Sequence, residues 1–288
     1  MASMRDIKRR KESIQSTGQI TKAMKLVATV KLQKAKARAE DSGPYFKAMY
    51  QAVKSILKKS ANLNHPYLVA GQSPKKGVIL ITSNRGLAGG YNSNVIKLVT
   101  QSGMKKEDIV IYAVGRKGRD GLARRGYEIA KDYSEAINEP LFSDASEIGK
   151  QVLEDFTAGK IGEIYLAYTD FKNTVSHIPT MVRLLPVALD ENDKEEEDTA
   201  DSLTLMNFEP EAEEALGMIV PKYVNSLIYG GLMQAVASEN GARMQAMDSA
   251  TNNAEEMISD LGLKYNRARQ SSITQELTEI IAGANAIS

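Results

Sequence analysis

The sequence predicts an α/β domain set between two long terminal helices that pair as an antiparallel coiled coil. Three observations lead to this prediction. Apolar residues near both ends of the 288-residue chain recur every three or four positions, as on one face of a helix. The middle of the chain alternates short β-type runs with helical runs. Residues 1–60 are strongly basic, whereas residues 207–288 are acidic.

The N-terminal section, residues 1–60, predicts one long helix followed by a second one. Gly18 is the weak helix former in the first helix and costs roughly 1 kcal/mol relative to Ala. The pair Gly43-Pro44 predicts a break or a bend before the second helix begins. The expected apolar stripe of the first helix consists of Ile20, Met24, Ala28, Leu32, Ala35 and Ala39, extended upstream by Ile7 and Ile14.

The central section, residues 75–190, predicts a compact α/β domain. Alternating strands and helices imply a mostly parallel sheet that is covered on both faces. An acidic loop, residues 190–206, follows this domain, and its run 190–201 holds eight acidic residues and one lysine. Four strands are expected, at 77–83, 108–115, 163–171 and 177–189, with helical segments at 92–103, 115–126 and 144–160.

The C-terminal section, residues 207–288, predicts a helix with a coiled-coil seam. A spacing of three and four that is sustained over this length is typical of a left-handed coiled coil. A helix of ~75 residues would be about 110 Å long, and Pro221 is placed to bend or restart it near its beginning. The seam consists of Met244, Met247, Thr251, Ala254, Ile258, Leu261, Tyr265, Ala268 and Ser272.

The charges of the two terminal sections predict that they pair with each other. Residues 1–60 carry 15 Lys and Arg against 4 Asp and Glu, a net charge of 15 − 4 = +11, and residues 207–288 carry 5 against 11, or 5 − 11 = −6. The C-terminal helix outruns its partner by about 25 residues on the 1.5 Å rise of both helices. Its last apolar residues, Ile273, Leu277, Ile280, Ile281 and Ala284, are therefore expected to find no partner within the chain.

Several classes of function find little support in the sequence. The chain has no cysteine, which excludes disulfides, thiolate metal sites and a cysteine nucleophile. The two histidines, His65 and His177, lie far apart, without the spacing of metal ligands. We expect no catalytic set, no bound cofactor, no signal peptide and no membrane-spanning segment.

Two motifs leave alternatives open. The glycine-rich run SNRGLAGGYNSN (83–94) follows a predicted strand and precedes a predicted helix, where a phosphate-binding loop would lie. Its G-x-x-G-G spacing matches neither the dinucleotide fingerprint nor the P-loop, so a tight turn or a surface contact loop is favoured. The basic N-terminal helix is compatible with nucleic-acid binding, but it has little aromatic interleaving and an acidic partner helix.

The chain resembles the gamma subunit of the bacterial F-type, or rotary, ATP synthase. The stretch ITQELTEIIAGANA resembles the family signature through Ile273, Thr274, Glu276, Glu279, Gly283 and Ala284. The opening IKRRKESIQSTGQITKAMKLVATVKLQKA (7–35), the run SNRGLAGGYNSN and the run ASENGARMQAMDSATNNA (237–254) also match the family, in order along the chain.

The resemblance implies a rotor role without a catalytic site in this chain. The paired terminal helices would form a central shaft inside a hexamer of three alpha and three beta subunits, which holds the catalytic nucleotide sites. The Rossmann-like α/β domain would form a foot that rests, with the epsilon subunit, on the membrane ring of c subunits. This places the chain as a peripheral protein on the cytoplasmic face of the bacterial cell membrane, coupling proton flow to ATP synthesis or hydrolysis, with no nucleic acid as a partner.

The resemblance also implies roles for particular residues. Met24 and Lys25 match positions where the shaft passes an acidic helix-turn-helix of beta, and Arg243, Gln270 and Thr274 match positions facing the beta catch loops. Arg85, Gly86 and Leu87, with Phe208, match foot surfaces that face the ring or epsilon. The absence of a cysteine-bearing insert means that the redox switch of chloroplast relatives is not expected.

Two alternatives from other classes stay open at this point. The first is an α/β nucleotide-binding enzyme with a coiled-coil oligomerisation arm. The second is a coiled-coil protein that binds nucleic acid with a steep dependence on salt.

Overall fold

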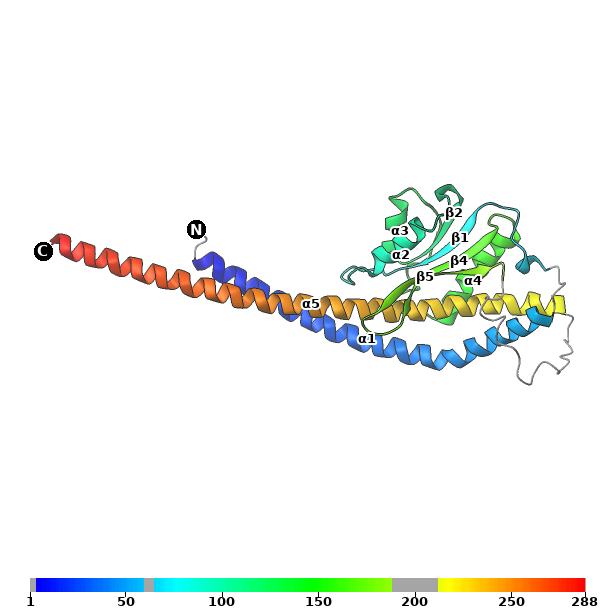
Figure 1. Cartoon of the computed structure of the whole chain (residues 1–288), viewed down its shortest axis with the longest axis horizontal. Coiled ribbons are helices and arrows are strands. Elements are labelled where there is room, and N and C mark those ends of the chain that lie inside the picture. Colours follow the sequence, from blue (N-terminus) through cyan, green and yellow to red (C-terminus); the bar gives the residue numbers. More distant parts are fainter. Residues whose placement is uncertain (1–3, 60–64, 188–211, 288) are drawn as a thin grey trace. The chain divides into compact units, whose positions relative to one another are not determined.

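The computed structural model describes residues 4–59, 65–187 and 212–287 (Figure 1). The chain divides into two compact units. We call residues 1–29 with 243–288 the coiled-coil unit, and residues 30–242 the foot unit. The division cuts both long helices, whereas the predicted boundaries at 60, 75, 190 and 207 follow the secondary structure. The predicted acidic loop, 190–206, lies outside the described residues.

Two long helices, α1 (Met4–Lys59) and α5 (Ala212–Ile287), begin and end the described chain. The sequence predicted a break or a bend at Gly43-Pro44. The break and the separate second helix are wrong, because α1 continues through Pro44, and its ribbon curves in Figure 1. Helix α5 likewise continues through Pro221. A proline removes one N–H donor and crowds the preceding turn, which can bend a helix without ending it.

The predicted seam of α5 is confirmed in the coiled-coil unit. Met247, Thr251, Ala254 and Leu261 are buried, and the other five seam positions are partly buried. The stripe predicted for α1 is correct at Ala28 but wrong at Ile20, which is 57% exposed.

Gly18 and Thr21 take the place of Ile20 in the α1 seam, and both are buried. The other predicted stripe positions in this unit, Ile7, Ile14 and Met24, are partly buried, so the prediction fails only at Ile20, where a large apolar residue was preferred to the smaller Gly18 and Thr21.

The foot unit is built on one five-stranded sheet in the order β3-β2-β1-β4-β5. Strands β1, β2, β3 and β4 are parallel, and β5 pairs antiparallel with β4. The mostly parallel sheet is therefore confirmed. The strands are β1 (Lys76–Ile81), β2 (Ile109–Val114), β3 (Glu128–Asp132), β4 (Glu163–Phe171) and β5 (His177–Leu185).

Strand β3 was not predicted from the sequence. It is an edge strand with largely exposed side chains, so its sequence has neither the apolar run nor the clean alternation of the other strands. A shift in its register against β2, between Ile111 and Tyr112, weakens the pattern further.

Helices cover both faces of the sheet. On one face, α2 (Tyr91–Thr100) and α3 (Arg116–Ala123) pack on β1 and β2 through a cluster that includes Val78, Leu80 and Leu122. On the other face lie α4 (Phe142–Thr157) and the first part of α5. Two short 3-10 turns, η1 (Pro66–Leu68) and η2 (Lys106–Asp108), complete the described elements.

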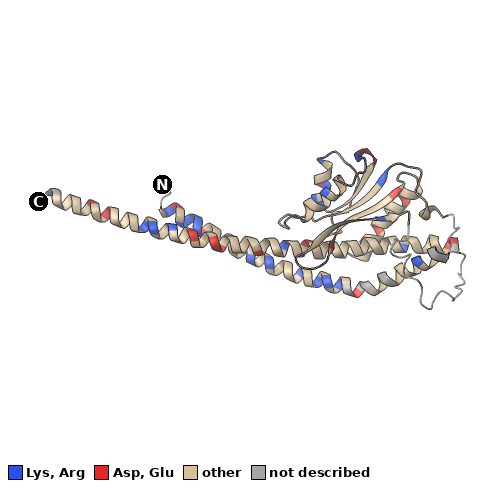
Figure 2. Ribbon diagram, in the orientation of Figure 1, with Lys and Arg blue, Asp and Glu red and all other residues tan. Residues whose placement is uncertain are grey.

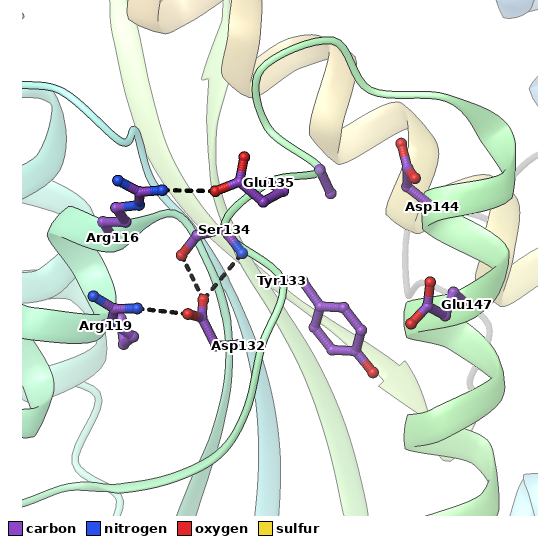
Figure 3. A pocket seen from close by; sticks show the side chains of 9 residues that line it. Arg116, Arg119, Asp132, Tyr133, Ser134, Glu135, Asp144 and Glu147 are labelled. Atoms are coloured by element: carbon purple, nitrogen blue, oxygen red, sulfur yellow. Dashed lines mark hydrogen bonds and ion pairs between the residues drawn. The ribbon is translucent and has the colours of Figure 1, made fainter.

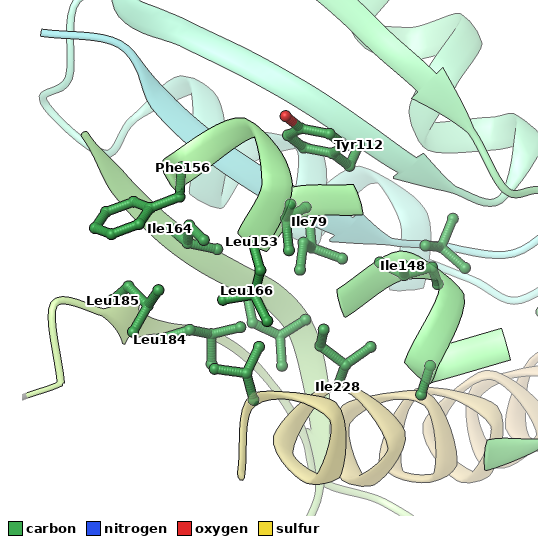
Figure 4. Packing of buried hydrophobic residues seen from close by; sticks show 14 of the residues in the cluster. Ile79, Tyr112, Ile148, Leu153, Phe156, Ile164, Leu166, Leu184, Leu185 and Ile228 are labelled. Carbon is green, nitrogen blue, oxygen red and sulfur yellow. The ribbon is translucent and has the colours of Figure 1, made fainter. Parts of the chain in front are cut away.

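The first part of α5 is a core element of the foot unit. Its residues at steps of four or three, from Leu216 to Ala235, are completely buried against the sheet and α4. In Figure 4, Ile228 of α5 lies near Leu166 of β4 and Ile148 of α4. The sequence analysis predicted that this whole helix belongs to the coiled coil. That prediction is wrong for its first thirty residues, which form a layer of the α/β domain.

Candidate functional site

The antiparallel helices of the coiled-coil unit are held in one register by side-chain contacts. Thr21 Oγ1 lies 2.8 Å from Thr251 Oγ1, and both side chains are buried. One turn toward the N-terminus of α1, a Cβ on Gly18 would lie 3.3 Å from the Cβ of Ala254. In both pairs the residue numbers add up to 272, as an antiparallel arrangement requires.

A charged pair continues the same register. Lys25 Nζ lies 2.5 Å from Asp248 Oδ1, with both side chains nearly half exposed. This pair joins the basic section to the acidic one, in keeping with the predicted attraction, and Figure 2 shows both kinds of charge along these helices. An exposed pair of this kind stabilises by only about 0–1 kcal/mol.

The register leaves the end of α5 without an α1 residue opposite it. Because paired residue numbers add up to 272 or 273, Met4 faces about residue 268 of α5. We call residues 273–287 the tail. Four large apolar residues of the tail, Ile273, Leu277, Ile280 and Ile281, are between 49% and 68% exposed.

A second apolar face lies on α1 in the same unit. Ile20, Leu26 and Val27 are each more than half exposed, although they are large and apolar. Soluble monomers rarely keep such residues adjacent on the surface, and contiguous apolar patches mark interaction sites. The coiled-coil unit therefore presents two incompletely covered faces, one on each helix.

The residues predicted to contact beta are distributed along this unit. Met24 and Arg243 are half-buried, and the ammonium of Lys25 is bound to Asp248. Gln270 and Thr274 are exposed, and the Thr274 hydroxyl donates to the backbone carbonyl of Gln270 at 2.9 Å. The Thr274 hydroxyl is thus bonded within its own helix.

The signature residues lie together on the tail. Glu276 and Glu279 are exposed, and Glu279 accepts a hydrogen bond of 3.1 Å from Gln275 Nε2. Gly283 has open space around its Cα, so no neighbour within the described residues requires a glycine there. Ile273, Thr274 and Ala284 complete the set, on the same uninterrupted helix.

In the foot unit, the loop between β1 and α2 contains Arg85, Gly86 and Leu87 and is held by hydrogen bonds. The Ser83 hydroxyl donates to the Arg85 carbonyl at 2.6 Å, and Asn92 Oδ1 accepts from the Ser83 backbone N–H at 2.9 Å. Leu87 adopts a positive φ of 63° while its side chain is 64% exposed. A left-handed conformation costs a non-glycine residue about 1–2 kcal/mol, and such strain is often found at binding sites.

This loop lies at a defined end of the foot unit. Strand β4 runs in the same direction as α5, because Leu166 packs near Gly231 whereas Thr169, further along β4, accepts a hydrogen bond from Ser238. Strand β1 is parallel to β4. The loop after β1 is therefore at the end of the foot unit that α5 reaches near Ala242.

A cleft of about 450 Å³ lies beyond the ends of β2 and β3 (Figure 3). Arg116 pairs with Glu135 at 2.6 Å, and Arg119 pairs with Asp132 at 2.5 Å. Burial alone would raise the pKa of Asp132, but hydrogen bonds from Ser134 and Arg119 outweigh it and hold that pKa below its ordinary value. Both arginines are thus engaged by acids, which does not favour a phosphate ligand.

Phe208, the remaining predicted foot residue, lies outside the described residues. Within residues 4–59, 65–187 and 212–287, no helix has an apolar stretch long enough to cross a bilayer. The same residues contain no group of three potential metal-ligating side chains.

Comparison with known proteins identifies the family. The family model described as ATP synthase matches residues 3–287. The ATP synthase gamma chain of Lachnoclostridium phytofermentans is 73% identical over 291 residues, covering all of both chains. The chain belongs to the ATP synthase gamma-chain family. A relative in Acetobacterium woodii, named as a sodium ion specific ATP synthase gamma chain, is 43% identical and covers 99% of each chain.

Solved structures support the fold of this ATP synthase family. A chain of the central stalk and c-ring of the Tetrahymena thermophila mitochondrial ATP synthase matches with a TM-score of 0.57 and 25% identity, covering 80% of this chain and 99% of that one. A chain of the Euglena gracilis mitochondrial ATP synthase gives a TM-score of 0.66 at 16% identity, covering 99% and 94%. The long terminal helices with a central α/β sheet are thus confirmed as the fold.

Sequence reasoning missed the polar contacts inside the coiled coil. Thr21 was not assigned to the seam, and Gly18 was regarded only as a weak helix former. The signal was present, because Gly18, Thr21, Lys25 and Ala28 also recur every three or four residues. A search restricted to large apolar residues passes over this stripe.

Proposed function

We propose that this chain is the central-stalk rotor subunit of a proton-translocating ATP synthase. Its paired helices rotate inside a hexamer of three alpha and three beta subunits, and its foot rests, with epsilon, on the ring of c subunits. The observation that carries the proposal is the tail, an apolar helical stripe that extends beyond the register of its partner helix. The hexamer supplies the burial that this chain does not provide.

Rotation couples ion flow to chemistry through the asymmetry of the shaft. The exposed faces of α1 and α5 differ, so three equivalent beta subunits each meet a different surface at any moment. Turning the shaft changes which subunit meets which face, and each catalytic site in turn changes its affinity for nucleotide. Moving one proton across 100 mV yields about 2.3 kcal/mol, so several steps must be summed by a stiff rotor. The chain itself is a non-catalytic subunit.

Five residues of the coiled-coil unit are proposed to contact beta: Met24, Lys25, Arg243, Gln270 and Thr274. Lys25 adds to a basic collar that complements an acidic segment of beta. Its exposed ion pair with Asp248 is weak, so a carboxylate of beta can share the ammonium as the shaft turns.

The loop of Arg85, Gly86 and Leu87 in the foot unit is proposed to contact epsilon or the ring of c subunits. The positive φ of Leu87 and its 64% exposed side chain support a contact surface at this loop.

We also propose the cytoplasmic face of the bacterial membrane as the site of action and the proton as the coupling ion. The Acetobacterium woodii relative is named as sodium ion specific, so the ion is to be tested separately. ATP synthesis can be measured in membrane vesicles with and without added Na⁺. A requirement for Na⁺ would identify sodium, rather than the proton, as the coupling ion, and the proposed rotor role would still hold.

Copurification tests the rotor proposal directly. A tag on this chain is expected to recover alpha, beta and epsilon at three, three and one per tagged chain, with ATPase activity. The proposal is wrong if the tagged chain is recovered alone from membranes that contain assembled alpha and beta.

Nucleotide titration tests the runner-up, an α/β nucleotide-binding enzyme with an oligomerisation arm. We expect no stoichiometric binding of ATP or ADP by the purified chain. Tight binding of one nucleotide per chain would favour the enzyme.

A further inference from the structure

The two threonine hydroxyls inside the coiled coil form a closed hydrogen-bond chain. Thr21 and Thr251 are 8% and 9% exposed, and their oxygens lie 2.8 Å apart. Each oxygen is also within reach of a carbonyl of its own helix, Gly18 at 3.0 Å and Met247 at 2.8 Å. A hydroxyl has one proton, so one threonine donates to its own helix and the other donates across the interface. Neither oxygen is left unsatisfied.

The residues on either side of this pair are matched in size. Gly18 faces Ala254 so closely that even a methyl group would be in tight contact. On the other side, Lys25 meets Asp248. A displacement of one helix by a single turn would separate the two hydroxyls in either direction, and in one direction it would also bring the large Ile258 opposite Gly18 in place of Ala254. The native register is therefore the one in which the polar groups meet each other.

We propose that Thr21 and Thr251 are positioning residues that hold the two helices in one register while the shaft carries torque. A seam made only of Ala, Leu, Ile and Met discriminates poorly between registers, whereas a single buried polar pair specifies one. The proposal rests on the proposed rotor function. Its consequence is a division of roles, in which the apolar seam binds the helices together and the threonine pair prevents them from sliding.

Sliding matters because it absorbs rotation. When one end of a two-helix rod is driven and the other end meets resistance, twisting displaces the helices along each other. A displacement of one turn, 5.4 Å, would let the foot advance without moving the tail by the same angle. Ion flow and nucleotide chemistry would then lose their fixed ratio, although each helix remained intact.

Cysteine cross-linking in the assembled complex reports the register, because the chain has no native cysteine. The pair Lys25→Cys with Asp248→Cys reports the native register. The pairs Lys25→Cys with Asn252→Cys and Lys25→Cys with Met244→Cys report a displacement of one turn in either direction. Each pair is oxidised during ATP hydrolysis, so that the shaft is under load.

The test compares three backgrounds for each cysteine pair. The variant Thr21→Val with Thr251→Val keeps the shape of both side chains and removes both hydroxyls. We expect the ratio of displaced to native cross-links to rise roughly two- to tenfold in this variant, which is the range expected for the loss of one hydrogen bond. Without the cysteines, the same variant is expected to pump fewer ions per ATP hydrolysed. Thr21→Ser with Thr251→Ser, which retains both hydroxyls, should restore both readouts.

Thr17→Val is the matched control, since Thr17 is exposed and bonds only within its helix, to the Ser13 carbonyl at 3.0 Å. It should change neither readout. If the double valine variant does not assemble, the single variant Thr251→Val carries the same expectation. Unchanged cross-link and pumping ratios in the valine variant would overturn the proposed lock and leave the rotor function standing. Failure of the unsubstituted chain to assemble with alpha and beta would instead overturn the rotor function.

Discussion

At the scale of single residues, the described part of the foot unit contains a buried carboxylate, that of Asp155. Asp155 of α4 is 7% exposed and accepts hydrogen bonds from the Tyr112 hydroxyl at 2.7 Å, Lys160 Nζ at 2.7 Å and Gln151 Nε2 at 3.2 Å. Burial alone would raise its pKa, but the bonds from Lys160, Tyr112 and Gln151 outweigh that cost, so the pKa lies below its ordinary value. The burial of Tyr112 itself, together with its hydrogen bond to Asp155, raises the pKa of the Tyr112 hydroxyl.

Replacing this carboxylate is expected to destabilise the foot in a pH-dependent way. Asp155→Asn should cost about 1–3 kcal/mol at pH 7, because it weakens hydrogen bonds to a buried charge. Since the folded pKa lies below that of an unfolded Asp, near 4, the carboxylate's contribution is complete above about pH 5 and is lost as the pH falls through the folded pKa. Urea unfolding at pH 7 and pH 3 measures both effects. Glu154→Gln, an exposed neighbour on α4, is the control, and an equal loss in both variants would contradict the expectation.

A second residue, Leu87, combines backbone strain with an exposed apolar side chain. Leu87→Gly should leave the isolated chain as stable as before or up to about 1 kcal/mol more stable, since relief of the left-handed strain is partly offset by the greater freedom of glycine when unfolded. Assembly with epsilon or the ring of c subunits should weaken. Leu87→Ala, which keeps the strain and removes the side chain, separates the two contributions. A loss of stability in the glycine variant would show that Leu87 is held by contacts of its own chain.

At the scale of elements, α5 serves three purposes along its length. Its first part is a core layer of the foot unit, its middle pairs with α1, and its tail extends beyond that register. The apolar residues that recur along α5 thus pack against three kinds of partner: a sheet, a helix and, in our proposal, another subunit.

Leucine substitutions on α5 distinguish the seam from the tail. Leu261 is buried in the seam and Leu277 is more than half exposed. Leu261→Ala should destabilise the isolated chain by about 2 kcal/mol or more, whereas Leu277→Ala should change its stability by less than about 0.5 kcal/mol. In the assembled complex, Leu277→Ala should reduce ATPase activity and subunit retention. Equal destabilisation of the isolated chain by both would indicate that the tail is packed on its own chain.

Most elements of the fold could be predicted from the sequence because their periodicities are long and regular. Strands β1, β2 and β4 are fully or largely buried and read as apolar runs, and the seam of α5 repeats over nine positions. Strand β3 could not be found, since its side chains are largely exposed and leave no apolar pattern in the sequence. Pro44 was misleading because a proline fixes the local backbone without deciding whether tertiary packing continues the helix.

The part of the candidate site that could be predicted is the tail, where exposed apolar residues recur with the period of a helix. The unpartnered stripe of Ile273 and Leu277 follows from helix lengths alone. The pairing of Thr21 with Thr251 does not, because an apolar pattern does not show which polar residues of the two helices meet. The proposed contacts of Met24 and Arg243 with beta depend on surfaces of other chains, which this sequence does not encode.

At the scale of the whole molecule, the chain is nearly neutral, with a net charge of +1, yet its charges are strongly segregated along the sequence. The basic N-terminal section meets the acidic C-terminal section through Lys25 and Asp248 in the coiled-coil unit. The foot unit has a sheet with a core on each face, whereas the described residues of the coiled-coil unit are held by one interface between two helices. We therefore expect the stability of the molecule to be uneven.

Hydrogen exchange should reveal this gradient and test the tail at the same time. Amides of β1 and β2, with no exposed side chains at their centres, should exchange slowest, because they open only when the foot unit unfolds. Amides of the seam around Thr251 should be intermediate. The tail should exchange fastest in the isolated chain, since a helix without a partner has little but its own propensity to hold it, and it should slow by at least about tenfold once the hexamer is bound. Slow exchange of the tail in the isolated chain, equal to that of the seam, would mean that its stripe is already buried, and the argument for an external partner would fail.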